Sequence, residues 1–578
     1  MQHSTDLSTY WLRIACAVGL LFQVSANASI ESTEPSPVAL EVELQLEEMM
    51  RSSELLTEHV LQQPDHVHTF YIARNYRPAW HDQQRLLQHA DHFLQYAKRA
   101  PLKGLFTTGL QLDVIDRLRD NLSAFDKARL DILLTDAFMT LSMQAARGSL
   151  DPLAVDRQWH YQRPEVDVVS LLSDALKTHD IAERLDALLP RDKSYHQLVS
   201  ALAFYRYLAD RGDWPKLAKH GPQLKLGMRS DELGVLRERL RLTGDLLVDA
   251  TAVDFFDTEL DKAVRHFQER HGLAVDGIIG RKTRQALNVP VDQRIRQILL
   301  NLERWRWLPR ELGERHIRID MAGFKLSVHD KDDISLSMRV IVGRNSRKTP
   351  SFTSDIDHLI LNPYWNVPEL IAKRDLMPRI LRDPKYLARQ RIRVLRGYGQ
   401  HEQELDSGSI DWSLYRNAPE LPFRFRQDPG VSNSMGQIKF VLPNPFAILL
   451  HDTPSKHLFN QSVRAYSSGC IRVEDPLALA DYVMGDTWQQ DDFRKIMDNR
   501  QSAVLTLPRP IPVHMLYMTA WAEPNGSVQF RQDVYGWDGP LLAAIRKSGQ
   551  PEPVEKVDAG TNKVETLARA GNRPIPQR

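Results

Sequence analysis

The sequence predicts a multidomain α+β protein. Hydrophobic residues recur at helical spacing through the first half of the chain, whereas from about residue 314 they alternate with period two, as in half-buried strands. A compact run of three short amphipathic helices lies between these regions. The 578 residues suffice for three or four domains of about 150 residues each. We therefore expect helical and β-rich domains in series.

The composition excludes several classes of protein. Lys and Arg number 75 and Asp and Glu number 74, which gives a formal net charge of +1. Nucleic-acid binders usually carry a basic surplus, so we expect no nucleic-acid partner. Cys16 and Cys470 are the only cysteines, too few for a zinc ribbon, an iron–sulfur site or a disulfide scaffold.

The N-terminus has the layout of a secretory signal. Residues 14–26 form an apolar run that is shorter than the span of about 20 residues that a membrane helix needs. Arg13 precedes this run, and Ala26-Asn27-Ala28 matches a small-residue cleavage site. We expect residues 1–28 to be a signal peptide and the protein to be periplasmic; the alternative is an uncleaved inner-membrane anchor. Cleavage leaves Cys470 as the single thiol.

Two terminal stretches and a large helical region frame the rest of the chain. Residues 29–50 are polar and contain two prolines, which favours a flexible lead. Residues 51–220 show helical periodicity and no evident chemistry, so we expect an α-helical scaffold domain. Residues 546–578 are polar and rich in proline, as in a disordered tail.

Residues 227–290 are predicted to form a small three-helix unit. Leu233, Leu236 and Leu240 share one helix face, and Gly272 is placed to end the second helix in the left-handed conformation. A bundle of this size is marginal alone, so we expect it to dock on a neighbour. With its Asp276-Gly277 turn, the unit resembles the peptidoglycan-binding domain of bacterial wall enzymes.

Residues 314–545 are predicted to form a β-rich domain with sheet or barrel packing. Alternating apolar residues mark several strands, for example at 334–342 and 438–442. Residues 366–426 interrupt this pattern with many arginines and five prolines. Long inserts of this kind are usually functional or disordered. We expect an inserted lid whose arginines bind substrate carboxylates; the alternative is that they form a solvated face.

One group of residues is suited to catalysis. His451 follows an apolar strand, and Cys470 follows a Ser-Ser-Gly run. A thiol becomes nucleophilic when an imidazole takes its proton, and Gly469 allows a turn that aims backbone amides at an oxyanion. Arg472 either holds a substrate carboxylate or braces the loop. The structural alternative is a buried cysteine beside a satisfied core histidine.

These residues carry a second resemblance. His451 and Ser468-Gly469-Cys470-Ile471-Arg472 resemble the signature of the L,D-transpeptidase (YkuD-type) catalytic domain. The match extends to Asn362-Pro363-Tyr364-Trp365 and to Asn433 with Gly436. Smaller members often carry His-Gly and Ser-His-Gly-Cys, where this chain has His451-Asp452 and Ser467-Ser468-Gly469-Cys470. The domain order is similar to that of the large Gram-negative, YcbB-like branch.

The resemblance implies a role for each matching residue. Cys470 is the nucleophile, His451 is the general base, and the backbone carbonyl of Asp452 orients His451. The amides of Gly469 and Cys470, with Ser468, form the oxyanion hole. The residues implied to bind substrate are Arg472, Tyr466, Trp365 and Asn433.

The same resemblance implies a reaction. Cys470 attacks a tetrapeptide stem, releases D-Ala and forms a thioester, which the amine of an acceptor stem converts into a 3→3 crosslink. It requires no cofactor, it is sensitive to carbapenems, and wall-synthesis proteins are further candidate partners. Three alternatives remain: an L,D-carboxypeptidase and a lipoprotein-to-wall transferase, which share the acyl-enzyme, and a non-catalytic wall-binding scaffold.

Overall fold

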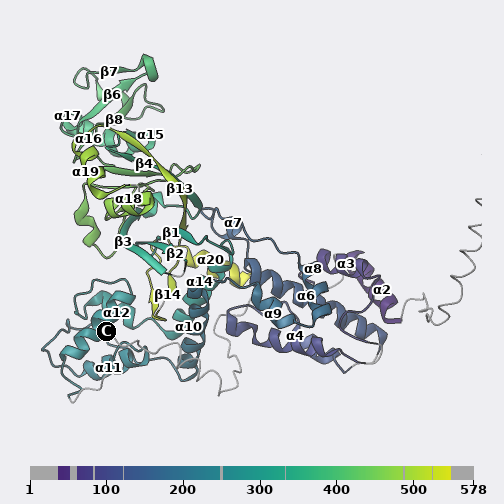
Figure 1. The fold of residues 1–578 in the computed structure, drawn as a ribbon. Coiled ribbons are helices and arrows are strands. Elements are labelled where there is room, and N and C mark those ends of the chain that lie inside the picture. The colour runs from purple at the N-terminus through teal and green to yellow at the C-terminus, as the bar shows by residue number, and fades with distance from the viewer. Residues whose placement is uncertain are drawn as a thin grey trace, which may run out of the picture.

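Figure 1 shows helical regions joined to a β-rich part in the computed structural model. The structure describes residues 37–51, 61–82, 85–120, 123–247, 252–331, 333–485, 488–523 and 525–547. The predicted signal peptide, residues 29–36 and all but the first two residues of the predicted tail lie outside these ranges. No helix in the described ranges is both long enough and apolar enough to span a bilayer.

The N-terminal region is helical, as predicted. Its helices are α2 (Pro37–Arg51), α3 (Pro64–Ala73), α4 (Gln88–Arg99), α5 (Leu112–Leu118), α6 (Ala124–Arg147), α7 (Pro152–Val155), α8 (Val168–Thr178), α9 (Ile181–Ala187) and α10 (Lys193–Asp210). The long α6 is central and buries most of its length. The Ser123 hydroxyl caps it by accepting from the Asp126 amide at 3.1 Å.

The prediction of a flexible lead over 29–50 is wrong for residues 37–50, which belong to α2. Pro37 begins the helix, where its missing N–H costs nothing. Ala39 and Val42 are buried, and the helix packs against α6. The glutamates of this stretch made it look uniformly polar, although one face is apolar.

The small unit is a three-helix bundle, as predicted. It comprises α11 (Glu232–Leu242), α12 (Thr258–Arg270) and α13 (Arg281–Leu287) around a core of its own. Gly272 ends α12 with a φ of +62°. Leu217 and Leu224 also pack in this core, so the unit begins before residue 227.

The last described segment packs against both the helical region and the β-rich part. Helix α14 (Val291–Arg306) runs along α10. The hairpin β14 (Ala520–Ala522) and β15 (Val528–Phe530) and helix α20 (Asp538–Lys547) contribute residues to the core of the helical region. Much of 516–547 therefore belongs structurally with the helices, although Tyr517, Tyr535 and Trp537 join the β-rich core.

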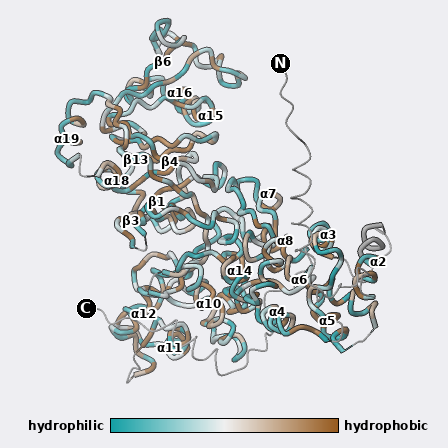
Figure 2. Tube along the Cα trace, turned by 45° about the vertical axis from the view of Figure 1, so that its right-hand side comes forward, coloured by the Kyte–Doolittle hydropathy of each residue, from teal (hydrophilic) through white to brown (hydrophobic). Residues whose placement is uncertain are grey.

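The β-rich part is a sheet that closes on itself. Its strands are β1 (Arg315–Asp320), β2 (Lys325–Asp330), β3 (Asp333–Gly343), β4 (Thr353–Leu361), β9 (Ile438–Val441), β10 (Leu450–His451), β11 (Ala465–Ser467), β12 (Ile471–Val473) and β13 (Ala503–Leu516). Their order is β11-β3-β12-β10-β9-β4-β13-β1-β2, and β2 also pairs with β3. Hydrophobic residues of β1, β4 and β13 gather in its core (Figure 2), and α18 (Pro476–Met484) and α19 (Gln490–Asp498) flank it.

The insert is a subdomain between β4 and β9. It contains β5 (Trp365–Val367), α15 (Glu369–Ile371), a π-helical turn (Ala372–Leu376), α16 (Met377–Arg382), α17 (Tyr386–Arg389), β6 (Ile392–Arg396), β7 (Gln403–Leu405) and β8 (Arg424–Gln427). The strands form a sheet in the order β5-β8-β6-β7 over a separate apolar core.

Candidate functional site

Strand pairing brings His451 and Cys470 to the same face of the sheet. Strand β10 runs parallel to β12, with Leu450 opposite Ile471 and His451 opposite Arg472. Leu450 and Ile471 face the core, so alternation directs the neighbouring side chains of His451, Cys470 and Arg472 to the other face.

The next strand adds a second cation to this face. Strand β9 is antiparallel to β10 and places Lys439 opposite His451. Lys439, His451 and Arg472 thus form one row across three adjacent strands, beside Cys470. This row lines a pocket of about 320 Å³ whose upper wall comes from the insert and includes Trp365, Ile371, Asp375 and Arg379.

The Cys470 thiol is held in its neutral form. Its Sγ lies 3.7 Å from the carbonyl oxygen of Ala447. Burial raises the pKa of Cys470, although a backbone hydrogen bond at Leu449 and the charges of Lys439 and Arg472 act in the opposite direction. Deprotonation therefore needs a base at the moment of attack.

Backbone groups hold the imidazole of His451. Its Nδ1 donates to the backbone carbonyl of Asp452 at 2.5 Å, a further backbone hydrogen bond involves Met435, and in this tautomer Nε2 carries the lone pair. Burial, reinforced by Arg472, lowers the pKa of His451 to about 3, so the imidazole is neutral at neutral pH. The arrangement favours a neutral thiol–imidazole pair over a preformed thiolate–imidazolium pair.

The carboxylate of Asp452 fixes the carbonyl on which His451 depends. Its Oδ2 accepts from the Gln437 amide at 2.9 Å, and its Oδ1 lies 2.7 Å from Nζ of Lys456. Gly436 packs directly on this side chain with a φ of +64°, and a Cβ there would lie 2.3 Å from the Asp452 Cβ. The loop therefore requires glycine at 436.

The loop before Cys470 differs from the expected oxyanion hole in one amide. Gly469 has a φ of +123°, as a glycine-dependent turn requires. Its N–H, however, donates to Ser467 Oγ at 3.1 Å, and that hydroxyl donates to the Cys470 carbonyl at 2.5 Å. The Gly469 amide is thus occupied within the turn. Among the described residues, the Cys470 amide has no acceptor.

Arg472 and Lys439 are cations without protein partners. Within the described part of the chain, neither side chain forms a hydrogen bond or an ion pair, and Arg472 Nε is buried without an acceptor. Arg472 therefore does not brace the loop. Burial lowers the pKa of both side chains, and an anion bound beside Cys470 would compensate this cost.

The other predicted substrate contacts separate into two groups. Trp365 lines the pocket. Tyr466 does not, because it alternates with the pocket residue Ser467 along β11 and is 42% exposed. Asn433 is fully buried, and its amide donates to the carbonyls of Pro363 and Asp428 at 3.1 and 2.9 Å. Asn433 stabilises a turn, so the structure argues against its predicted contact with substrate.

Four of the ten arginines in residues 366–426 pair with carboxylates of the same region or its edge, and Arg424 and Arg426 share Glu402. Arg389 pairs with Asp383, and Arg393 pairs with Asp428. Arg379 lines the pocket and donates to the Tyr386 hydroxyl at 2.9 Å. The solvated-face interpretation fits the four paired arginines, and carboxylate binding is open to Arg379.

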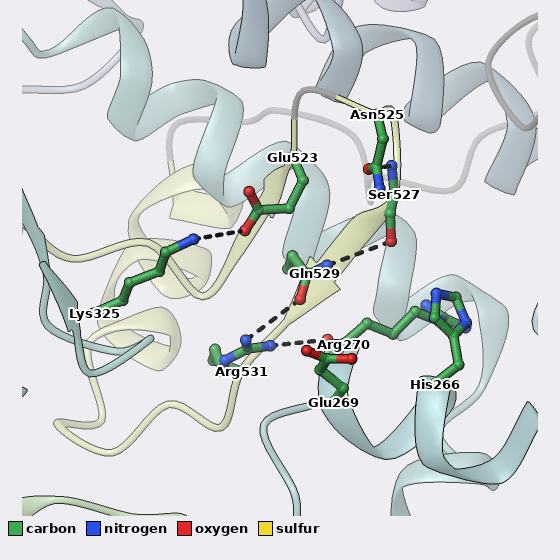
Figure 3. A pocket seen from close by; sticks show the side chains of 9 residues that line it. All are labelled: His266, Glu269, Arg270, Lys325, Glu523, Asn525, Ser527, Gln529 and Arg531. Carbon is green, nitrogen blue, oxygen red and sulfur yellow. Dashed lines mark hydrogen bonds and ion pairs between the residues drawn. The ribbon is translucent and has the colours of Figure 1, made fainter. Parts of the chain in front are cut away.

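A second polar cavity of about 630 Å³ lies where α12 meets β2 and the β14–β15 hairpin (Figure 3). Lys325 pairs with Glu523 at 3.4 Å, and Arg531 donates to the backbone carbonyl of Arg270 at 2.8 Å. Arg270 in turn pairs with Asp245. Of these contacts, the one between Arg531 and Arg270 joins the three-helix unit to the segment after β15, so the unit docks on a neighbour, as the sequence predicted.

Sequence reasoning missed two parts of the site. Lys439 alternates with Ile438 and Phe440 in a strand that was predicted, so its outward position was available from the pattern. Asp375 reaches the site from the insert through a π-helical turn, for which the sequence gave no signal.

Three family models match separate parts of the chain. Residues 65–202 match a scaffold domain, residues 229–287 match a "Putative peptidoglycan binding domain", and residues 314–499 match an L,D-transpeptidase catalytic domain.

Curated relatives agree with these matches. A protein of Haemophilus influenzae named "Putative L,D-transpeptidase" is 34% identical over 249 residues, which are 43% of this chain and 49% of that protein. The chain therefore spans about half the length of this relative. The N-acetylmuramoyl-L-alanine amidase CwlM of Mycobacterium tuberculosis is 40% identical over 75 residues, 12% of this chain and 18% of that protein.

Two solved structures share little overall geometry with this chain. An L,D-transpeptidase of Xylanimonas cellulosilytica has 14% identity and a TM-score of 0.17, over 51% of this chain and 98% of that chain. A fused Zn-dependent amidase/peptidase with a peptidoglycan-binding domain from Clostridium acetobutylicum has 13% identity and a TM-score of 0.14, over 51% and 100%. These scores support no argument about the fold.

The family models confirm the resemblances that the sequence motifs suggested. Residues 314–499, which include His451 and Cys470, match an L,D-transpeptidase catalytic domain, and other parts of the chain match a scaffold domain and a putative peptidoglycan-binding domain.

Proposed function

We propose that the protein is an L,D-transpeptidase that forms 3→3 crosslinks in peptidoglycan through a thioester on Cys470. The observation that carries the proposal is the row of Lys439, His451 and Arg472 beside Cys470, on the floor of one pocket. It provides a nucleophile, a base and unpaired cations for an anionic donor.

The first half of the reaction is acylation. His451 Nε2 takes the thiol proton as Sγ attacks the carbonyl carbon between the diamino acid and the terminal D-Ala. The Cys470 amide donates to the developing oxyanion. The C–N bond then breaks, the protonated His451 gives its proton to the amine of D-Ala, and the tripeptide remains as a thioester.

The second half transfers the acyl group. The side-chain amine of an acceptor stem loses its proton to His451 and attacks the thioester carbon. The C–S bond breaks, Cys470 leaves and regains a proton, and a new amide links the two stems. Two substrates used in turn predict ping-pong kinetics.

Charge supports the donor assignment. A tetrapeptide stem ends in a carboxylate, and Arg472 offers an unpaired guanidinium two residues after the nucleophile on the same face. Trp365 and Ile371 give the pocket an apolar wall, which favours an amine acceptor over water. A wall substrate also implies a periplasmic or extracellular location, in line with the predicted signal peptide.

Product mass spectrometry distinguishes the candidate functions. The chain from Ser29 and its Cys470→Ala variant are each incubated with disaccharide-tetrapeptide. We expect a Cys470-dependent dimer that lacks one D-Ala and contains a 3→3 bond. Cys470-dependent tripeptide alone would indicate a carboxypeptidase. Stem transfer only to a lipoprotein's terminal lysine would indicate an attachment enzyme, and wall binding without any product would indicate a scaffold.

A further inference from the structure

The loop after β3 holds the loop that carries the nucleophile. Arg344 and Arg347 both donate to Ser468 Oγ, at 3.0 and 2.8 Å. Thr349 Oγ1 donates to the Gly469 carbonyl at 2.6 Å. Residues 344–349 therefore fix the two residues that precede Cys470.

Thr349, at the end of this loop, is held by contacts that do not involve the insert. The Tyr535 hydroxyl donates to the Gly343 carbonyl at 2.7 Å, and the Gly343 amide donates to Thr349 Oγ1 at 3.0 Å. The position of Thr349 is thus set by the β-rich core. Arg347, two residues before Thr349 in the same loop, contacts the insert instead.

The insert supplies the carboxylate that Arg347 needs. Both terminal nitrogens of Arg347 pair with the two oxygens of Asp375, one of them at 3.3 Å. The Arg347 side chain is only 11% exposed, so removing its counter-charge would leave a largely buried cation. Arg344 lies 3.8 Å from the same carboxylate. Asp375 thus links the insert to Arg344 and Arg347, the two arginines that hold Ser468.

The backbone at Asp375 is also unusual. Residues 372–376 form a single π-helical turn between α15 and α16. Such turns interrupt α-helices and occur frequently at functional sites.

We propose that Asp375 is a positioning residue. Through Arg347 it fixes Ser468 and the neighbouring Cys470 amide. The position of the insert therefore controls how well the loop that carries Cys470 is arranged for acylation. The effect on acylation rests on the proposed function, whereas the coupling between the insert and the loop does not. Although Asp375 lies in the pocket wall, both its oxygens pair with Arg347, so we assign it to positioning and not to the reaction itself.

Single-turnover acylation by the tetrapeptide donor, followed by intact-protein mass spectrometry, tests the coupling. We expect Asp375→Asn to slow acylation about 10- to 100-fold at saturating donor, because misplacement of a reacting group has effects of this size. Asp375→Glu should recover part of the rate. Asp383→Asn is the matched control, since it removes an exposed ion pair with Arg389 within the same insert, and it should change the rate less than about twofold.

A double-mutant cycle separates positioning from general damage. If Asp375 acts through Arg347 and Ser468, then Asp375→Asn should cause little further loss in a Ser468→Ala background. Three results would overturn the proposal. The first is that the Asp375→Asn and Ser468→Ala losses in acylation rate multiply in the double variant. The others are an equal loss of rate in Asp383→Asn and an effect confined to the KM for the donor.

Alkylation of Cys470 by iodoacetamide supplies a readout that needs no substrate. Its rate should differ between wild type and Asp375→Asn, and this difference should vanish in the Ser468→Ala background. A wild type that forms no acyl-enzyme would contradict the proposed function, yet the alkylation rates would still test the coupling. Identical alkylation rates in wild type and Asp375→Asn would overturn it.

Discussion

At the reactive thiol, burial opposes ionisation more strongly than the neighbouring cations favour it. Burial raises the pKa of Cys470 and lowers the pKa of His451 to about 3. The two groups therefore rest as a neutral pair, and in the proposed reaction His451 acts as a base only during attack.

This balance predicts the pH dependence of thiol alkylation. Thiolate is the reactive form, and its fraction grows with pH until the raised pKa is reached. The alkylation rate of Cys470 should therefore climb about tenfold per pH unit from pH 6 past pH 8.5. A rate that is already at a plateau at pH 6 to 7 would indicate a preformed ion pair and contradict this account.

At the scale of elements, strands β1, β2 and β13 share a cluster of three histidines, His316, His329 and His514, whose pKa values burial lowers. His316 on β1 stacks on His329 of β2 with ring centroids 4.9 Å apart. Nδ1 of His316 donates to the Gly313 carbonyl at 2.7 Å, and Nε2 accepts from Arg318 at 2.9 Å. Burial, followed by the charge of Arg318, lowers the pKa of His316 to about 4.

A buried neutral histidine makes stability fall in acid. Between about pH 6.5 and pH 4 the unfolded chain binds a proton at residue 316 that the folded chain does not, so the free energy of unfolding decreases as the pH falls. His316→Gln should reduce this slope by about 1.4 kcal/mol per pH unit within that window. Denaturant unfolding at several pH values measures it, and an unchanged slope would show that His316 does not contribute.

The elements were predictable where one periodicity dominates. Alternation located β1, β3 and β9, and helical spacing located the three-helix unit. Helix α2 was missed because its exposed glutamates hide a short apolar face. The sequence does not show which polar groups remain free, because this depends on tertiary contacts. The motif placed Asn433 and the Gly469 amide near the site. In the structure, Asn433 donates to backbone carbonyls and the Gly469 amide donates to Ser467.

At the scale of the whole molecule, the C-terminal segment joins the helical region to the β-rich part. Asp538 at the start of α20 pairs with Arg304 of α14 at 2.6 Å and accepts from Thr519 Oγ1 at 2.9 Å. Sequence order assigned this segment to the catalytic domain, and only the three-dimensional packing reveals its second role.

Removing one partner of this junction should destabilise the molecule. Asp538→Ala leaves the Arg304 side chain, which is 3% exposed, without its carboxylate. We expect a loss of about 3 kcal/mol, seen as a lower unfolding temperature. Asp491→Ala, which breaks an exposed pair with Arg494, is the control and should change stability by less than about 1 kcal/mol. Equal effects of the two variants would refute this role for the junction.

The thioester on Cys470 is tested most directly by trapping the protein during turnover with a tetrapeptide donor and no acceptor, and then measuring its mass. We predict an adduct equal to the donor minus D-Ala, which peptide mapping locates on Cys470 and which Cys470→Ala lacks. An adduct on another residue, or products formed at the wild-type rate by Cys470→Ala, would contradict this prediction.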